Sequence, residues 1–239
     1  MREPLYIVIV AGQSNALGLS PVAGLEESQR KTYENLPIFL DTNYPHPRAG
    51  VWQSVRPGLG VDEARFGLEM GVAETLSLQK ARYALVKYAS DGTSLCDRWN
   101  AETRGEDYES LLKTVKRATA SLDREIRLAG FIWMQGCNDA CYENASVEYG
   151  KNLRSFIEGV RAELCEDLPF VIGQINPVNP YLPYRERVIE AQKRTAETLK
   201  RVRFVATDDL LSLVDNYHYD APCEWELGKR LAKELLKIK

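Results

Sequence analysis

The chain has 239 residues, of which 44% are hydrophobic and 27% charged, and its formal net charge is −3. This composition is ordinary for a globular protein, and the length suits one α/β domain spanning 1–239. The weakly acidic balance gives no reason to expect a nucleic-acid partner, and no apolar stretch approaches the roughly 18 to 20 residues of a membrane span.

Apolar runs alternate with longer amphipathic segments along the chain. Strands are predicted at Leu5–Val10, Tyr83–Tyr88, Leu128–Met134, Phe170–Ile175 and Arg203–Thr207, with a weaker one at Pro37–Leu40. Helices are predicted at Gly67–Gln79, Tyr108–Leu122, Ser146–Cys165, Tyr184–Lys200 and Glu224–Ile238. This alternation indicates an α/β fold in which a parallel sheet of about five strands is covered by helices on both faces.

The segment 17–66 interrupts this rhythm, because it contains five prolines and several glycines. Long irregular insertions in compact domains often carry function. Since the segment follows a candidate serine, we expect it to form one wall of a pocket, although a surface excursion without a ligand role is the alternative.

A serine directly follows the first predicted strand, in the turn Gly12-Gln13-Ser14-Asn15. Open α/β sheets bind their ligands at the carboxyl ends of the strands. Ser14 is therefore a candidate nucleophile, and we expect its neighbours Gln13 and Asn15 to bind substrate.

The only two histidines are His46 and His218, so the search for a base is short. Asp215 precedes His218 by three residues, a spacing at which the carboxylate can reach the imidazole in a turn and hold its tautomer. His218 is the predicted base. His46 lies between two prolines, and we expect it to be structural, with a position in the pocket lining as the alternative.

Acyl transfer also needs hydrogen-bond donors for the oxyanion. Gly92 follows the strand Tyr83–Tyr88, and its small size lets a backbone N–H approach a ligand closely. Gln135 and Asn138 follow the strand Leu128–Met134, and either side-chain amide could donate.

Taken in order, these blocks resemble the SGNH-hydrolase superfamily, and more narrowly the sialate O-acetylesterase-like domain of carbohydrate esterase family 6, which includes acetylxylan esterases. The motifs that carry the resemblance are Gly12-Gln13-Ser14-Asn15, Phe66-Gly67-x-Glu69-x-Gly71, Gly92, Trp133-x-Gln135-Gly136-x-x-Asp139 and Asp215-x-x-His218-x-Asp220 with Leu227-Gly228-x-Arg230.

The resemblance implies a flavodoxin-like, doubly wound, three-layer α/β/α sandwich with no metal and no organic cofactor. It implies Ser14 as nucleophile, His218 as base and Asp215 as the acid that orients it. The oxyanion hole would use the backbone N–H groups of Ser14 and Gly92 together with an amide side chain.

One position departs from the family pattern, because Cys137 stands where carbohydrate esterases of this type usually have glutamate. The wider superfamily block Gly-x-Asn-Asp fits Gly136 to Asp139, so the third oxyanion donor is either Asn138 or Gln135. Cys137 itself is a weaker candidate nucleophile.

The five cysteines have an odd, unpatterned count, which indicates reduced thiols and no disulfide framework. Cys137 and Cys141 lie four residues apart, but no Cys-x-x-Cys or His-x-x-x-His pair accompanies them, so a zinc site is not expected. The N-terminus does not resemble a signal peptide, and we expect a cytoplasmic location unless a leader preceded it.

The sequence therefore predicts a serine esterase that removes acetyl or other small acyl groups from an acetylated sugar or oligosaccharide through an acyl-serine intermediate. We expect no membrane partner. The alternative is a non-catalytic sugar- or nucleotide-binding module with an anion near the turn after the first strand. That turn contains one glycine and lacks the phosphate-binding glycine patterns.

Overall fold

The computed structural model describes residues 3–238 and contains one seven-stranded sheet with the strand order β4-β3-β6-β1-β7-β8-β9. The strands are β1 (Leu5–Gly12), β3 (Tyr33–Thr42), β4 (Trp52–Val55), β6 (Tyr83–Ala89), β7 (Ile126–Met134), β8 (Phe170–Gly173) and β9 (Val202–Val205). A separate two-stranded sheet pairs β2 (Ser20–Pro21) with β5 (Arg65–Phe66).

Strand β1 lies at the centre of the sheet, with β6 on one side and β7 on the other. All neighbouring pairs in the large sheet are parallel except β3–β4. The chain completes one half of the sheet with β3, β4 and β6, of which the last lies beside β1, before it starts the other half at β7. The carboxyl end of β1 is therefore a topological switch point, where open α/β sheets form their binding crevices.

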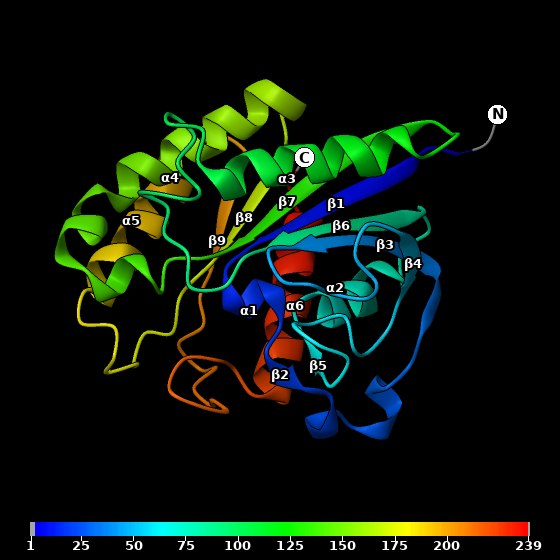
Figure 1. Cartoon of the computed structure of the whole chain (residues 1–239), viewed down its shortest axis with the longest axis horizontal. Coiled ribbons are helices and arrows are strands. Elements are labelled where there is room, and N and C mark those ends of the chain that lie inside the picture. Colours follow the sequence, from blue (N-terminus) through cyan, green and yellow to red (C-terminus); the bar gives the residue numbers. More distant parts are fainter. Residues whose placement is uncertain (1–2, 239) are drawn as a thin grey trace.

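Helices cover both faces of the sheet, which gives three layers (Figure 1). Helices α2 (Glu69–Leu76) and α6 (Ala221–Leu235) pack together on one face, and α3 (Glu106–Ala120), α4 (Glu143–Leu164) and α5 (Arg185–Thr198) cover the other. The remaining helical segments are short: α1 (Ser14–Leu17) and the 3₁₀ turns η1 (Val22–Gly24), η2 (Glu27–Gln29) and η3 (Asp139–Cys141).

The side chains of β1 alternate between two hydrophobic cores. Val8 and Val10 join the core beneath α2 and α6, whereas Ile7 and Ile9 join the core beneath α3, α4 and α5. All four are fully buried. Burying a side chain of this size stabilises the fold by about 1.5–3 kcal/mol, so β1 anchors the turn that follows it.

The structure confirms the predicted three-layer α/β/α sandwich, but the sheet has seven strands and not about five. The difference lies in the segment 17–66, which is not irregular throughout: it supplies the whole of β3 and the edge strand β4. The register shifts between Tyr33 and Pro37 where β3 pairs with β4, and the pairing with β6 begins only at Ile38. Proline has no N–H to donate to a neighbouring strand, which explains why the strand pattern of the sequence is weak around Pro37.

A buried ion pair connects β6 to the start of α2. The Nζ of Lys87 lies 2.7 Å from Oε2 of Glu69, and both side chains are almost completely buried. Lys87 also donates to the carbonyl oxygens of Leu17 and Leu59, at 2.8 and 2.9 Å. The three bonds of this one ammonium hold α1, the loop before β5 and the start of α2 against the sheet.

A second buried carboxyl group lies near this pair. Glu224 of α6 is completely buried, and neither of its carboxyl oxygens has a hydrogen-bond partner among the described residues. Burial, together with the charge of Glu69, raises the pKa of Glu224 well above its usual value, while Lys87 acts in the opposite direction.

Among residues 3–238, no helix is long and apolar enough to cross a membrane. Within the same range, no group of three or more His, Cys, Asp and Glu side chains is arranged to hold a metal ion.

Candidate active site

The predicted nucleophile lies where β1 ends at the centre of the sheet. Gly12 has a φ of +146°, and a Cβ there would lie 2.0 Å from the carbonyl oxygen of Met134. Only glycine allows β1 to approach β7 so closely. The N–H of Gln13 then donates to the same Met134 oxygen at 3.0 Å, and Ser14 begins α1 with 4% of its surface exposed.

The predicted base and its acid lie in the loop between β9 and α6. The Nδ1 of His218 is 2.7 Å from Oδ2 of Asp215. The other carboxylate oxygen of Asp215 accepts the backbone N–H groups of Tyr217 and His218, at 2.7 and 2.9 Å. Burial raises the pKa of Asp215, but these three hydrogen bonds outweigh it, with the net result that its pKa lies below the ordinary value. The carboxylate therefore stays charged and orients the imidazole.

Asn15 joins the serine turn to the histidine loop. Its Nδ2 donates to the carbonyl oxygen of Tyr217 at 3.4 Å, and its Oδ1 accepts the N–H of Tyr219 at 3.3 Å. One amide thus holds the backbone on both sides of His218. The hydroxyl of Ser20 donates to the carbonyl oxygen of Tyr219 at 2.6 Å. Both backbone polar groups of Tyr219 are therefore hydrogen-bonded to side chains.

Gln13 makes an equivalent connection to the loop after β7. Its Oε1 accepts the N–H groups of Gly136 and Asn138, at 2.9 and 3.3 Å. The side chains of Gln13 and Asn15 are 4% and 3% exposed, so protein groups occupy most of their polar atoms. Their predicted contact with substrate stays a prediction, while the structure shows both amides connecting loops.

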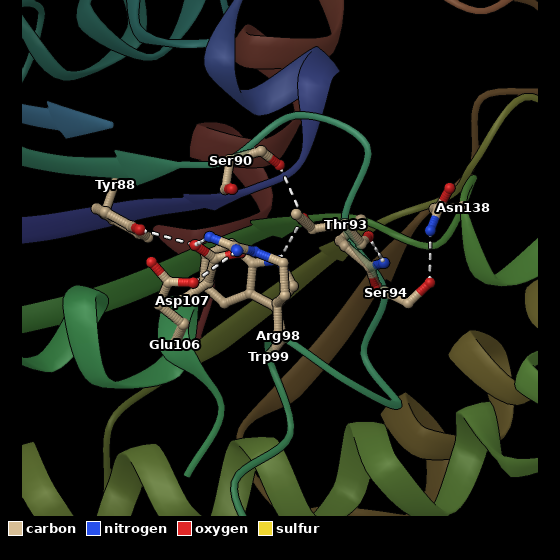
Figure 2. A network of polar contacts seen from close by, with 10 residues as sticks. Tyr88, Ser90, Thr93, Ser94, Arg98, Trp99, Glu106, Asp107 and Asn138 are labelled. Carbon is tan, nitrogen blue, oxygen red and sulfur yellow. Dashed lines mark hydrogen bonds and ion pairs between the residues drawn. The ribbon is translucent and has the colours of Figure 1, made fainter. Parts of the chain in front are cut away.

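Gly92 lies between Ser90 and Thr93, in a turn that hydrogen bonds hold in place; Figure 2 shows the two flanking residues. The hydroxyl of Thr93 donates to the carbonyl oxygen of Ser90 at 2.8 Å and accepts the indole N–H of Trp99 at 2.7 Å. Gly92 itself has a φ of +63°, and a Cβ there would meet nothing within 4 Å. The turn is therefore fixed, while the space beside Gly92 is open to a ligand.

Figure 2 also shows a second cluster of hydrogen bonds, between Arg98 and the start of α3. Arg98 donates to both carboxylate oxygens of the buried Asp107, at 2.7 and 2.9 Å, and Tyr88 donates to the same carboxylate at 2.8 Å. Tyr88 belongs to β6, so this cluster ties the loop back to the strand from which it emerges. A bidentate pair of this kind adds geometric precision as well as energy.

The structure distinguishes the two amides considered for the third oxyanion donor. The Nε2 of Gln135 donates to the carbonyl oxygen of Thr93 and to Asp139, at 2.9 and 2.6 Å, and the side chain is completely buried. Asn138 is partly exposed and donates to Ser94 at 2.6 Å (Figure 2). Because an amide nitrogen carries two hydrogens, this bond leaves Asn138 a second donor.

Asp139 connects the loop after β6 to the loop after β7. Its carboxylate accepts the N–H of Leu95 as well as the Gln135 amide, and the side chain is completely buried. Burial raises the pKa of Asp139 to about 6, although the hydrogen bonds it accepts lower it.

Cys137 and His46, the other reactive side chains considered, lie in unfavourable surroundings. Burial raises the pKa of the Cys137 thiol to about 12, whereas a thiol nucleophile needs a lowered pKa. The Nδ1 of His46 accepts the N–H of Arg48 at 3.2 Å, and the side chain is 7% exposed. Burial lowers the pKa of His46, which favours the neutral imidazole. Its hydrogen bond to Arg48 stabilises the loop in which both residues lie.

Sequence reasoning missed the residues that position the site. Lys87, Ser94 and Asp139 hold the loops that carry the candidate residues, yet none was assigned a role. Lys87 offered one signal, because a lysine inside an otherwise apolar strand is unusual unless it is paired. A groove of about 570 Å³ between α4 and α5 contains none of the predicted site residues.

Comparison with known proteins adds a family and a set of similar folds. Residues 4–237 match the family described as "Carbohydrate esterase, sialic acid-specific acetylesterase". No curated protein matches the chain significantly.

Three solved structures illustrate the similarity of fold. A protein from Arabidopsis thaliana is 21% identical with a TM-score of 0.82, covering 99% of this chain and 100% of its own. NanS is 14% identical with a TM-score of 0.76, and the match covers 99% of this chain and 98% of NanS. A carbohydrate acetylesterase from Xanthomonas citri is 18% identical with a TM-score of 0.70, covering 98% of this chain and 56% of its own.

Proposed function

The chain belongs to the carbohydrate esterase family of sialic acid-specific acetylesterases, and from this premise we propose that Ser14, His218 and Asp215 perform its reaction. Membership makes the protein a carboxylic ester hydrolase that acts on acetylated carbohydrates, and it disfavours a non-catalytic binding module. The observation that carries the assignment of residues is the Asn15 amide, which binds the backbone on both sides of His218 from the position next to Ser14.

The first half of the reaction transfers the acetyl group to the enzyme. The Nε2 of His218 removes the proton from the Ser14 hydroxyl as its oxygen attacks the ester carbonyl carbon. Asp215 holds Nδ1–H and stabilises the imidazolium that forms. When the tetrahedral intermediate collapses, the bond to the sugar oxygen breaks and His218 returns the proton to that oxygen, releasing the sugar with a free hydroxyl.

The second half regenerates the enzyme with water. His218 removes a proton from a water molecule, whose oxygen attacks the acetyl-serine carbonyl. The second tetrahedral intermediate expels the Ser14 oxygen, which recovers its proton from His218, and acetate leaves. No group other than these side chains and water is required for the balance of atoms and charge.

We assign the oxyanion hole to the backbone N–H groups of Ser14 and Gly92 and the side-chain amide of Asn138. The N–H of Ser14 lies in the first turn of α1, where N–H groups lack acceptors within the helix. The turn of Gly92 is fixed and has open space beside it. Asn138 is supported over Gln135 because Gln135 is buried and already donates twice within the protein.

The proposal is tested by acetate release from a panel of acetylated sugars. Wild-type protein is expected to release acetate, and Ser14→Ala is expected to keep the fold and lose this activity. Labelling of wild type by an organophosphate, located by mass spectrometry of peptides, should fall on Ser14. Unchanged hydrolysis by Ser14→Ala would overturn the assignment. The cytoplasmic location stays a prediction.

A further inference from the structure

The loop that follows β8 is attached directly to the histidine loop. Asn179, which is 1% exposed, donates from Nδ2 to the carbonyl oxygen of Asn216 at 2.5 Å. Its Oδ1 accepts the N–H of Tyr181 at 2.9 Å. One buried amide therefore fixes the backbone of Tyr181 relative to the segment that carries Tyr217 and His218.

Two tyrosine rings lie side by side on these two loops. The ring centroids of Tyr181 and Tyr217 are 5.7 Å apart, and the ring planes are tilted by 48°. Tyr181 is 52% exposed and Tyr217 37% exposed, so the pair is open to solvent although its backbone is held. The ring of Tyr217 is also 6.4 Å from the imidazole of His218.

The direction of proton transfer shows which part of a substrate meets these rings. Under the proposed function, His218 donates its proton to the oxygen of the leaving sugar, whereas the carbonyl oxygen faces Ser14, Gly92 and Asn138. The sugar therefore lies on the His218 side of the scissile bond, where the exposed rings are.

We propose that Tyr181 and Tyr217 form the subsite for the pyranose ring of the leaving sugar, an inference that rests on the proposed function. The face of an aromatic ring carries partial negative charge, and the C–H face of a pyranose supplies matching positive hydrogens while its hydroxyls remain in water. Tyrosine offers this area with few rotatable bonds, so little conformational freedom is lost on binding. The two rings select a cyclic sugar ester over an open-chain polyol ester.

The test compares a cyclic with an acyclic acetyl ester. We choose xylose tetraacetate and glyceryl triacetate, and measure kcat/KM for each by acetate release. Tyr181→Ala is expected to lower the ratio of the two values about three- to tenfold, mainly through KM for the sugar ester, because an aromatic contact of this kind is worth roughly 0.5–1.5 kcal/mol. Tyr181→Phe should keep the ratio, since the ring face remains.

Two further variants sharpen the comparison. Tyr217→Ala combined with Tyr181→Ala should lower the ratio further than either alone. Tyr83→Ala is the matched control, because its ring also pairs with a tyrosine, Tyr6, at 5.7 Å, but lies at the amino end of β6, at the opposite edge of the sheet, and its ratio should equal that of wild type. If Tyr181→Ala changes both substrates equally, or changes neither, the subsite is wrong.

A binding measurement separates this inference from the proposed function. Saturation-transfer NMR with methyl β-xylopyranoside is applied to Ser14→Ala, which cannot turn over an ester. Saturation should pass from the protein to the ring protons of the xyloside. If this transfer disappears when Tyr181→Ala is added to Ser14→Ala, the subsite is supported, even if wild type proves to hydrolyse no ester. Transfer that persists in that double variant overturns the subsite and leaves the hydrolytic proposal to be judged by its own experiment.

Discussion

The ammonium of Lys87 lies 2.7 Å from the carboxylate of Glu69 inside the protein and holds the end of the helix that Ser14 begins. Removing one partner of a buried pair leaves an unpaired buried charge, which costs about 3–5 kcal/mol. We expect Lys87→Met to lower the free energy of unfolding by this amount in urea denaturation.

The matched variant is Lys87→Met with Glu69→Gln, which removes both charges. It should recover part of the lost free energy, because the uncompensated carboxylate is gone. A double variant no more stable than Lys87→Met alone would contradict a coupled pair and assign the loss to packing of the lysine side chain.

Asp215 is expected to matter less to turnover than Ser14 or His218. Asp215→Asn keeps an oxygen for the backbone N–H groups but removes the charge that stabilises the imidazolium. Related triads lose roughly 10⁴-fold in kcat on this change and about 10⁶-fold when the serine or histidine is removed. Asp215 is half exposed, so water can replace part of its effect, and we expect a loss of about 10²- to 10⁴-fold. A loss as large as that of Ser14→Ala would show a further role for the carboxylate.

Asn138→Ala should lower kcat by about 10²- to 10³-fold with little change in KM, because an oxyanion donor acts mainly in the transition state. Asn138→Asp is the control of similar size, since it removes the donor and adds a charge that repels the oxyanion. Thermal unfolding should remain close to wild type, because Asn138 is partly exposed. A variant with wild-type kcat would remove Asn138 from the oxyanion hole.

Asn15 tests whether the histidine loop is positioned from the serine turn. Asn15→Ala removes both hydrogen bonds to the loop and should cost about 1–3 kcal/mol of stability, because the buried N–H of Tyr219 is left without its partner. We also expect kcat to fall for every ester, cyclic or acyclic. Hydrogen exchange at 212–220 is the additional readout, and protection identical to wild type would contradict the positioning role.

The carboxyl group of Glu224 has no hydrogen-bond partner within residues 3–238, and we expect it to make the stability of the protein depend on pH. Its pKa in the folded protein is raised well above the ordinary value of about 4.3. The folded state therefore binds the proton more tightly than the unfolded state, so the stability from this group is complete below about pH 4.3 and is lost as pH rises through the folded pKa.

Glu224→Gln replaces this group by one that never ionises. We expect the variant to be at least as stable as wild type at pH 8 and to show a flatter dependence of unfolding free energy on pH above about 4.3, measured by urea denaturation. An equally steep dependence in the variant would assign the effect to another group.

The central strands were predictable from sequence because they are buried on both faces. The runs at β1, β6 and β7 are nearly continuous in apolar residues, and their predicted bounds differ from the observed ones by one or two residues. Strand β3 was only partly predicted, since Glu34, Asn35 and Pro37 interrupt its pattern. Edge strand β4 has no such run, and its pairing depends on β3.

The candidate site could be chosen from the sequence as a set of residue types, but its arrangement could not be predicted. The motif around Ser14 and the Asp215–His218 spacing singled out those residues, whereas the choice between Gln135 and Asn138 depends on burial that only the folded loop determines. The amides of Gln13 and Asn15 reach partners 123 and 204 residues away along the chain. No local pattern can reveal which distant backbone such a side chain will meet.

The hydrogen bonds between Asn15 and the loop that carries His218 also determine when this loop can dock during synthesis. The backbone that Asn15 holds at Tyr219 lies 204 residues further along the chain and follows every strand of the sheet, so a ribosome adds it after the sheet. A nascent chain can therefore complete the whole sheet before the loop that carries His218 has been made. Under the proposed function, hydrolysis begins only once the loop between β9 and α6 has docked, and its onset during synthesis would date that docking.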